Sequence, residues 1–108
     1  MAKKLPPITP GDILLEEFMQ PMGISQNQLA RDIHVPPNRI SQIIHGKREI
    51  TADTALRLGK YFEIEPEFWL NLQVRFNMKL AKEKAGAKID KEVKSYHSNP
   101  KSSHVHPV

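Results

Sequence analysis

Two consecutive prolines, Pro36 and Pro37, directly precede a short run of residues whose isoleucines recur at helical spacing. Proline has no N–H group and a φ close to the helical value, so a helix accommodates it in its first turn but not in its interior. The run therefore predicts a helix over 37–45 that stops at Gly46, a residue type that favours helix ends. The predicted buried face consists of Ile40, Ile43 and Ile44.

The opposite face of this predicted helix is polar and rich in groups that can form two hydrogen bonds at once. In the major groove of DNA, Asn and Gln pair bidentately with adenine, and Arg pairs with O6 and N7 of guanine. We therefore predict that Asn38, Arg39 and Gln42 read base edges.

The preceding segment completes the pattern of a helix-turn-helix motif, in which a short helix and a tight turn lead into a recognition helix. Ser25 is a favoured N-cap for a helix over 26–33. Ala30 provides the small residue that the crossing of the two helices needs. The turn often contains a glycine with positive φ, and here His34 takes its place, which is uncommon but allowed.

Positive charge is concentrated on the same segment. Residues 25–48 contain four basic residues and one acidic residue, whereas 10–24 contain three acidic residues and no basic one, and 49–67 contain five acidic and two basic residues. Such a local excess is typical of a phosphate-binding surface, and free N–H groups at the start of 26–33 would add to it. The residues predicted to contact the DNA backbone are Ser25, Gln26, Pro37, Ser41, His45, Lys47 and Arg48.

Three further helices and no strand follow from caps and periodicity. One begins with Thr9 as N-cap and is broken at 21–23, a second begins at Thr51, and the third covers about 66–85. The last has two apolar stripes: Trp69, Leu72, Phe76 and Leu80, and Leu70, Val74, Met78 and Ala81. One stripe suffices for docking onto the domain. We therefore predict a homodimer whose interface contains Leu70, Val74 and Met78.

The composition changes after residue 85, where the chain becomes polar and loses its period. We divide the chain into an N-terminal arm (1–8), a DNA-binding and dimerisation domain (9–85) and a flexible polar tail (86–108). The sequence contains no cysteine, no apolar run of the roughly 20 residues that a membrane span needs, and no apolar signal core at the N-terminus. We expect a soluble, cytoplasmic protein.

Nothing in the sequence indicates an enzyme or a cofactor. No nucleophile and base occur at a suggestive spacing. Three histidines of the tail, His97, His104 and His106, lack the Cys or Asp partners that usually accompany them in metal sites, so no metal site is predicted.

Residues 10–78 resemble the HigA/VapI antitoxins of the Xre-type helix-turn-helix group. The resemblance is carried by the "PG" opening, by "GKREIT" followed by "DTALRL", and above all by "EFWLNLQ" with an aromatic residue after it. It implies an all-α, five-helix, lambda-repressor-like DNA-binding domain that acts as a homodimer on double-stranded DNA with an inverted-repeat operator. It also implies pairing with a HigB-type toxin that cleaves messenger RNA.

The sequence departs from the family pattern at two places. Prolines 36 and 37 stand where family members often have a Ser or Thr cap, and Asn77 stands where an Asp is usual. Two functions remain open at this point: an antitoxin that neutralises a toxin and represses its own operon, and a free-standing Xre-type transcriptional regulator without a toxin partner.

Overall fold

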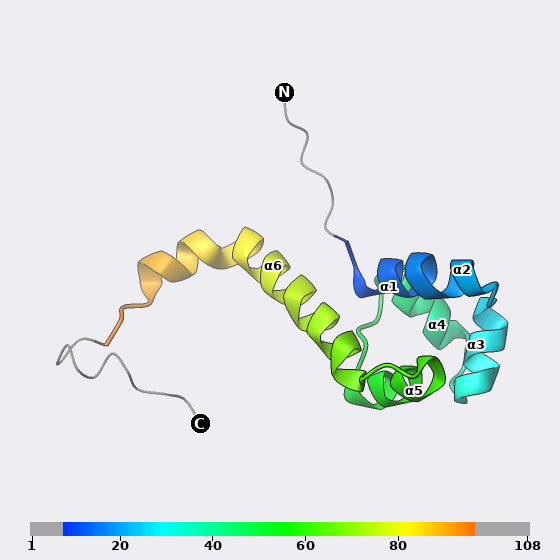
Figure 1. Cartoon of the computed structure of the whole chain (residues 1–108). Helices are drawn as coiled ribbons and strands as arrows, with labels where there is room; N and C mark the ends of the chain where they lie inside the picture. The colour runs from blue at the N-terminus through cyan, green and yellow to red at the C-terminus, as the bar shows by residue number, and fades with distance from the viewer. Residues whose placement is uncertain (1–7, 97–108) are drawn as a thin grey trace.

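The computed structural model describes residues 8–96, and every regular element in that range is a helix (Figure 1). The first helix runs without a break through α1 (Pro10–Ile13), the π-helical turn η1 (Leu14–Met19) and α2 (Gln20–Met22). The others are α3 (Gln26–Ile33), α4 (Pro37–Ile44), α5 (Ala52–Phe62) and α6 (Pro66–Glu92). The predicted all-α fold of five helices is confirmed.

The helix starts lie where the sequence places them, because local side-chain groups satisfy the free N–H groups of the first turn. Thr9 and Asp12 form a capping box, with each side chain accepting a hydrogen bond of 3.0 Å from the other residue's backbone N–H. Ser25 and Thr51 cap α3 and α5 by a single hydrogen bond each, since their hydroxyl oxygens accept from the N–H groups of Gln28 and Thr54. Pro37 opens α4 with Pro36 as an extended N-cap residue, so the two prolines begin this helix as predicted.

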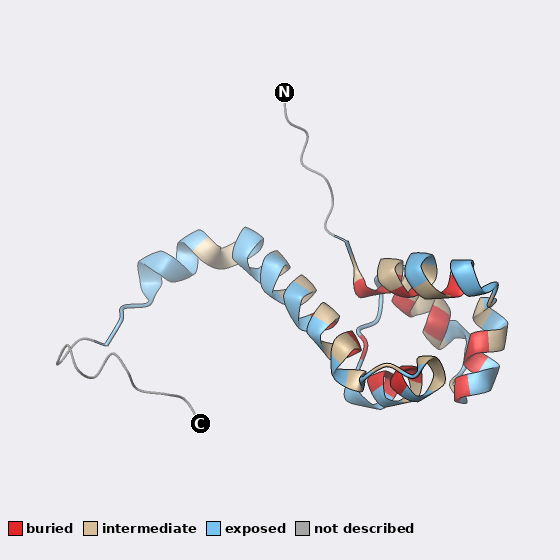
Figure 2. Cartoon of the chain, viewed as in Figure 1, coloured by how far each residue is buried: buried red, intermediate tan, exposed pale blue. Residues whose placement is uncertain are grey.

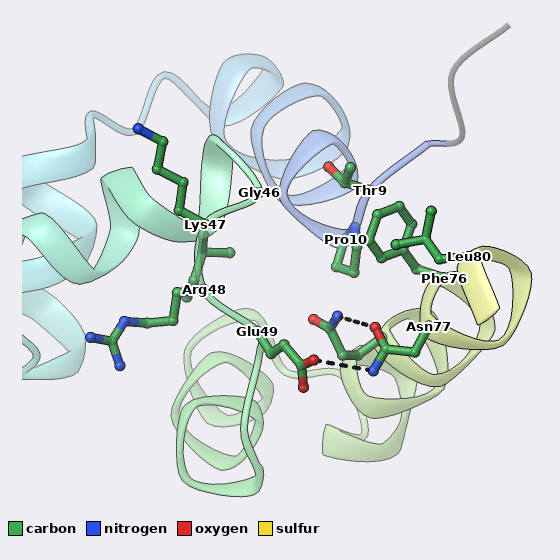
Figure 3. A pocket seen from close by; sticks show the side chains of 11 residues that line it. Thr9, Pro10, Gly46, Lys47, Arg48, Glu49, Phe76, Asn77 and Leu80 are labelled. Carbon is green, nitrogen blue, oxygen red and sulfur yellow. Dashed lines mark hydrogen bonds between the residues drawn. The ribbon is translucent and has the colours of Figure 1, made fainter. Parts of the chain in front are cut away.

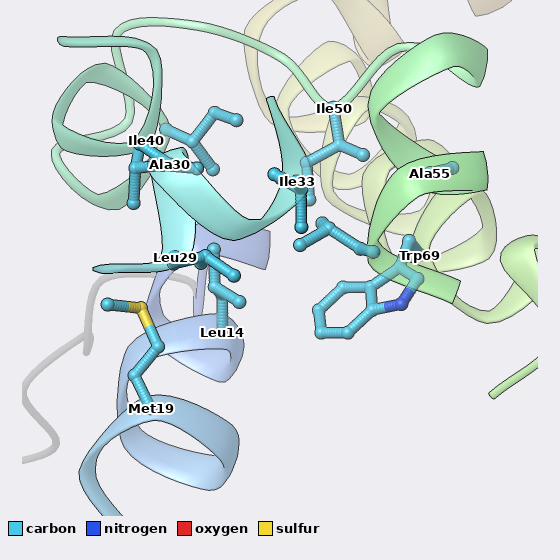
Figure 4. Close-up of a cluster of buried hydrophobic side chains, with 11 residues drawn as sticks. Leu14, Met19, Leu29, Ala30, Ile33, Ile40, Ile50, Ala55 and Trp69 are labelled. Carbon is cyan, nitrogen blue, oxygen red and sulfur yellow. The ribbon is translucent and has the colours of Figure 1, made fainter. Parts of the chain in front are cut away.

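The core lies between the first helix, α3, α4 and α5, and the start of α6 closes it (Figure 4). Leu14, Leu29, Ile40 and Leu58 are fully buried there, together with Trp69 of α6. Aromatic rings add a second layer that binds the first helix to α5 and α6, because the Phe18 ring lies 5.0 Å from that of Phe62 and 4.9 Å from that of Trp69.

Gly11 allows the closest approach between α1 and α4. A Cβ atom at this position would collide with the carbonyl oxygen of Ile43 and lie 2.7 Å from the Cα of Ile44. Both are backbone atoms, so no side-chain rotation can relieve the overlap. The glycine therefore sets how α4 is seated on the domain.

We expect Gly11→Ala to lower the free energy of unfolding by about 1–3 kcal/mol or more, because the two helices must move apart. The melting temperature measured by circular dichroism would then fall by several degrees. Gly86→Ala is the matched control: its Cβ would meet Lys82 Cβ at 3.9 Å, an ordinary contact, so we expect a neutral or slightly stabilising effect. Equal melting temperatures for Gly11→Ala and the parent protein would contradict the proposed packing.

The predicted end of the last helix near residue 85 is wrong, since α6 continues to Glu92. Residues 86–92 include several good helix formers, and Lys88 and Glu92 form an exposed i,i+4 ion pair of 3.9 Å. A polar composition does not by itself indicate loss of structure, because a solvated helix has the same composition. Residues 1–7 of the predicted arm (1–8) and residues 97–108 of the predicted tail (86–108) lie outside the described residues.

Burial ends part-way along α6, and the helix projects away from the other helices (Figure 2). Only Trp69 and Gln73 of this helix are buried. Leu70 is half-buried against the core, whereas Val74 is 57 % and Met78 51 % exposed. None of the helices within residues 8–96 has both the length and the apolar character that crossing a membrane requires.

Candidate nucleic-acid interface

The turn between α3 and α4 has the geometry that a helix-turn-helix motif needs. His34 adopts a left-handed conformation with a φ of 61°, the role that glycine often has at this place. Its backbone N–H donates to the carbonyl oxygen of Arg31 over 3.3 Å, and the N–H of Val35 donates to that of Ala30 over 3.0 Å. The last turn of α3 is thereby closed, and the chain can enter α4 at once.

The packing beneath α4 leaves one face of this helix free. Ala30 is 1 % exposed in the core against which α4 packs, as the small-residue prediction requires. Ile40 and Ile43 are also buried, while Ile44, predicted to lie with them, is only half-buried. Within residues 8–96, α4 packs against α3 and α1 through its apolar residues, and its polar residues face outward.

Two residues of α5 form hydrogen bonds with the last turn of α3 and the turn that follows it. Neither residue was predicted from the sequence. Arg57 donates from Nη1 to the carbonyl oxygens of Ile33 and His34 over 2.8 and 3.3 Å, so it caps the C-terminus of α3. Tyr61 donates its hydroxyl to Asp32 over 2.7 Å, and this hydrogen bond raises the pKa of the tyrosine. These partners are 23 to 29 residues apart in sequence, a separation over which periodicity gives no signal.

The three residues predicted to read bases lie together on the outer face of α4. Asn38 is exposed, and Arg39 and Gln42 are half-buried by their neighbours. Gln42 is also tied to the loop that follows, because Arg48 donates from Nε to its Oε1 over 2.8 Å. The face thus offers amide and guanidinium groups within one and a half helical turns.

The predicted backbone contacts border this face. Ser25 caps α3, and its hydroxyl oxygen already accepts a hydrogen bond of 3.0 Å from the N–H of Gln28. His45 at the end of α4 approaches Ser41, with 2.7 Å between its Nδ1 and the serine carbonyl oxygen. Lys47 and Arg48 are exposed in the loop after α4 and point away from α6 (Figure 3).

A chain of polar contacts fixes this loop to α6. Gln73, one of the few buried polar residues, accepts a hydrogen bond from the N–H of Ile50 over 2.8 Å and donates to Asn77 over 3.1 Å. Asn77 in turn donates to Glu49 over 3.4 Å (Figure 3). A groove of about 290 Å³ lies beside these residues, between the loop, α6 and the start of α1. Neither Gln73 nor Glu49 has a role that could be predicted from the sequence.

The same contacts explain why position 77 has an asparagine and not an aspartate. Its side chain accepts from Gln73 and donates to the Glu49 carboxylate, which an aspartate could not do. We expect Asn77→Asp to place two carboxylates side by side and to lower the free energy of unfolding by about 0.5–1 kcal/mol at neutral pH. The double variant Glu49→Gln/Asn77→Asp should regain most of that loss in urea unfolding. A loss of the same size in both variants would contradict the role assigned to Glu49.

The residues predicted for the dimer interface are on α6, apart from the DNA-facing residues. Val74 and Met78 share its exposed side, and Leu70 lies closer to the core. Within residues 8–96, no group of His, Asp and Glu side chains is arranged to hold a metal ion. His97, His104 and His106 lie outside the described residues.

One protein-family model matches the part of the chain that contains this helix-turn-helix arrangement. The family model HTH_3, described as Helix-turn-helix, matches residues 15–69, just over half of the 108 residues. The chain belongs to the HTH_3 family of helix-turn-helix proteins. The match includes α3, the turn and α4 in full, so the motif predicted from caps, prolines and periodicity is the one that defines the family.

A relative and two solved structures extend the similarity beyond the motif. The chain is 48 % identical to virulence-associated protein I of Dichelobacter nodosus over 80 residues, which are 74 % of each chain. It is 52 % identical to an addiction module antidote protein of the HigA family from Coxiella burnetii, with a TM-score of 0.80 over 85 % of this chain and all of that one. It is 38 % identical to the antitoxin HigA of Pseudomonas aeruginosa, solved with the higBA promoter, with a TM-score of 0.80 over 82 % of this chain and 97 % of that one.

Proposed function

We propose that this protein is the antitoxin of a HigBA-type toxin–antitoxin module, which neutralises an mRNA-cleaving toxin and represses its own operon as a DNA-bound dimer. The observation that carries the proposal is its 52 % identity to a HigA-family antidote protein, all of which it covers. This similarity includes the helix-turn-helix motif and also α6, most of which lies beyond residues 15–69 that the family model matches. The function requires no catalytic site, and a repressor of this kind acts in the cytoplasm.

The exposed face of α4 supports the repressor part of this function. Asn38, Arg39 and Gln42 present the groups that pair with adenine and guanine in the major groove. Lys47 and Arg48 flank them on an exposed loop, where positive charges can bind phosphate. We assign base readout to the first three residues. The backbone contacts go to seven others, which are Ser25, Gln26, Pro37, Ser41, His45, Lys47 and Arg48.

A single domain of this size reads only about four or five base pairs, which is too few to select one site in a genome. Proteins of this kind therefore bind as two-fold dimers, with recognition helices about 34 Å apart and half-sites about one helical turn apart. The exposed side of α6 at Val74 and Met78 is the surface we assign to this dimer, with Leu70 at its inner edge.

Co-expression tests the antitoxin part directly. The gene adjacent to this one is expressed from an inducible promoter, alone and together with this protein, and growth and mRNA integrity are followed. We expect growth arrest and mRNA cleavage when the neighbouring gene is expressed alone, and relief of both by this protein. Arrest that persists in the presence of the protein would exclude neutralisation. A harmless neighbouring gene would favour the free-standing regulator.

A further inference from the structure

The hydrogen bond between Arg48 and Gln42 fixes which atoms of the glutamine face outward. A guanidinium group has N–H donors and no acceptor, so the atom it meets at 2.8 Å must be the amide oxygen of Gln42. Within residues 8–96, the amide nitrogen of Gln42 donates to no other group. One of the two lone pairs of the amide oxygen is therefore bound on the loop side, and within the same range both N–H donors are unbound.

This orientation disfavours the usual pairing of glutamine with adenine. That pairing needs the amide oxygen to accept from adenine N6 while the amide nitrogen donates to N7. Here the oxygen is already bound to Arg48 and turned toward the loop. The free donors match a base edge that has acceptors only, and guanine has two of them, N7 and O6.

The backbone position of Arg48 is fixed by contacts of the residues on either side of it. Its neighbours on both sides are fixed: the N–H of Lys47 donates to the carbonyl oxygen of Gln42 over 2.8 Å, and Glu49 is bound by Asn77 of α6. Figure 3 shows the Glu49 side chain directed to α6 and that of Arg48 directed away from it. Gly46 makes the tight reversal with a φ of 74°, which brings the loop back against α4.

We propose that Arg48 is a specificity-determining residue that acts through Gln42: it holds the glutamine amide so that Gln42 reads guanine in place of adenine. The proposal rests on the proposed function, in which Gln42 contacts a base. Among the described residues the Nη groups of Arg48 have no hydrogen-bond partner, so they can bind a phosphate, and this residue would couple a backbone contact to the choice of base. Asn77 and Gln73 would support the arrangement from α6.

The test compares four proteins on a set of operators in which every base pair of one half-site is varied: the parent chain, Gln42→Ala, Arg48→Met and Lys47→Met. Gln42→Ala identifies the base pair that Gln42 reads, since the preference there disappears. At that position we expect the parent protein to bind G·C about tenfold more tightly than A·T. Arg48→Met should lose this preference or shift it to A·T. Lys47→Met, the matched control, should weaken binding to all base pairs equally.

Three outcomes would overturn the proposal, and they differ in what else they affect. If the parent protein prefers A·T at the base pair that Gln42 reads, the glutamine pairs with adenine, and the proposed repressor function stands. If Arg48→Met weakens all four base pairs equally, as Lys47→Met does, Arg48 is a phosphate contact alone and the proposed repressor function stands. If Gln42→Ala changes the preference at no position, both this inference and the assignment of Gln42 to base readout are wrong. Melting curves test whether the variants are folded, which we expect because Lys47 and Arg48 are exposed.

Discussion

Replacing Val74 with glutamate is expected to convert the protein from dimer to monomer and to weaken operator binding by on the order of a hundredfold or more. The side chain is more than half exposed in the single chain, next to Met78 on the projecting part of α6. In a two-fold interface each mutation acts twice and places two unpaired charges among apolar groups, which costs several kcal/mol. Leaving the same apolar side chains in water would forgo about 1.5–3 kcal/mol for each large one.

Sedimentation velocity at micromolar concentration and operator titration measure the two effects on the same sample. Leu56→Glu is the matched control, because Leu56 is 62 % exposed on α5 and lies outside the α6 stripe. We expect this variant to remain dimeric and to bind the operator normally. A Val74→Glu protein that stays dimeric would show that another surface forms the dimer.

The second large effect is expected for Arg39→Ala. A bidentate contact to guanine contributes about 1–3 kcal/mol of discrimination, and a dimer makes it twice, so the loss of operator affinity should be about 2–6 kcal/mol. The variant should also discriminate less against other bases at the one base pair of each half-site that Arg39 contacts. Arg39 is half-buried on the outer face of α4, and its replacement leaves the hydrophobic core intact.

Lys47→Ala is the control for Arg39→Ala, since it removes a positive charge from the neighbouring loop. We expect it to weaken binding to all sequences alike and to reduce the dependence of log affinity on log salt by about one unit for each phosphate that is no longer neutralised. If Arg39→Ala also acts equally on every sequence, Arg39 contacts the backbone and the assignment of base readout on α4 must be revised.

The features that could be predicted from the sequence are those that depend on residues close together in the chain. Thr9, Ser25 and Thr51 cap helices because their hydroxyls satisfy N–H groups within three residues, so the helix starts could be predicted. The two prolines fixed the start of α4 for an equally local reason. The burial of Ala30, Ile40 and Ile43 followed from the helical period, whereas Ile44 is only half-buried.

The parts that could not be predicted depend on contacts between distant residues. Arg57 caps α3 from α5, and Gln73 binds the N–H of Ile50 from 23 residues away. A glutamine beside an apolar stripe gives no sign in the sequence that it will be buried against a loop. The π-helical turn and the full length of α6 were missed as well, since neither has a signature in apolar period.

Methylation interference on the protein's own operator tests most directly the central claim, that the outer faces of two α4 helices read DNA in successive major grooves. Methyl groups on guanine N7 lie in the major groove and block contacts there. We predict two patches of interference about 10 base pairs apart, arranged as an inverted repeat, with one guanine in each patch becoming insensitive in Arg39→Ala. Tight binding without interference at any guanine N7, or a single patch without a symmetry mate, would contradict this account.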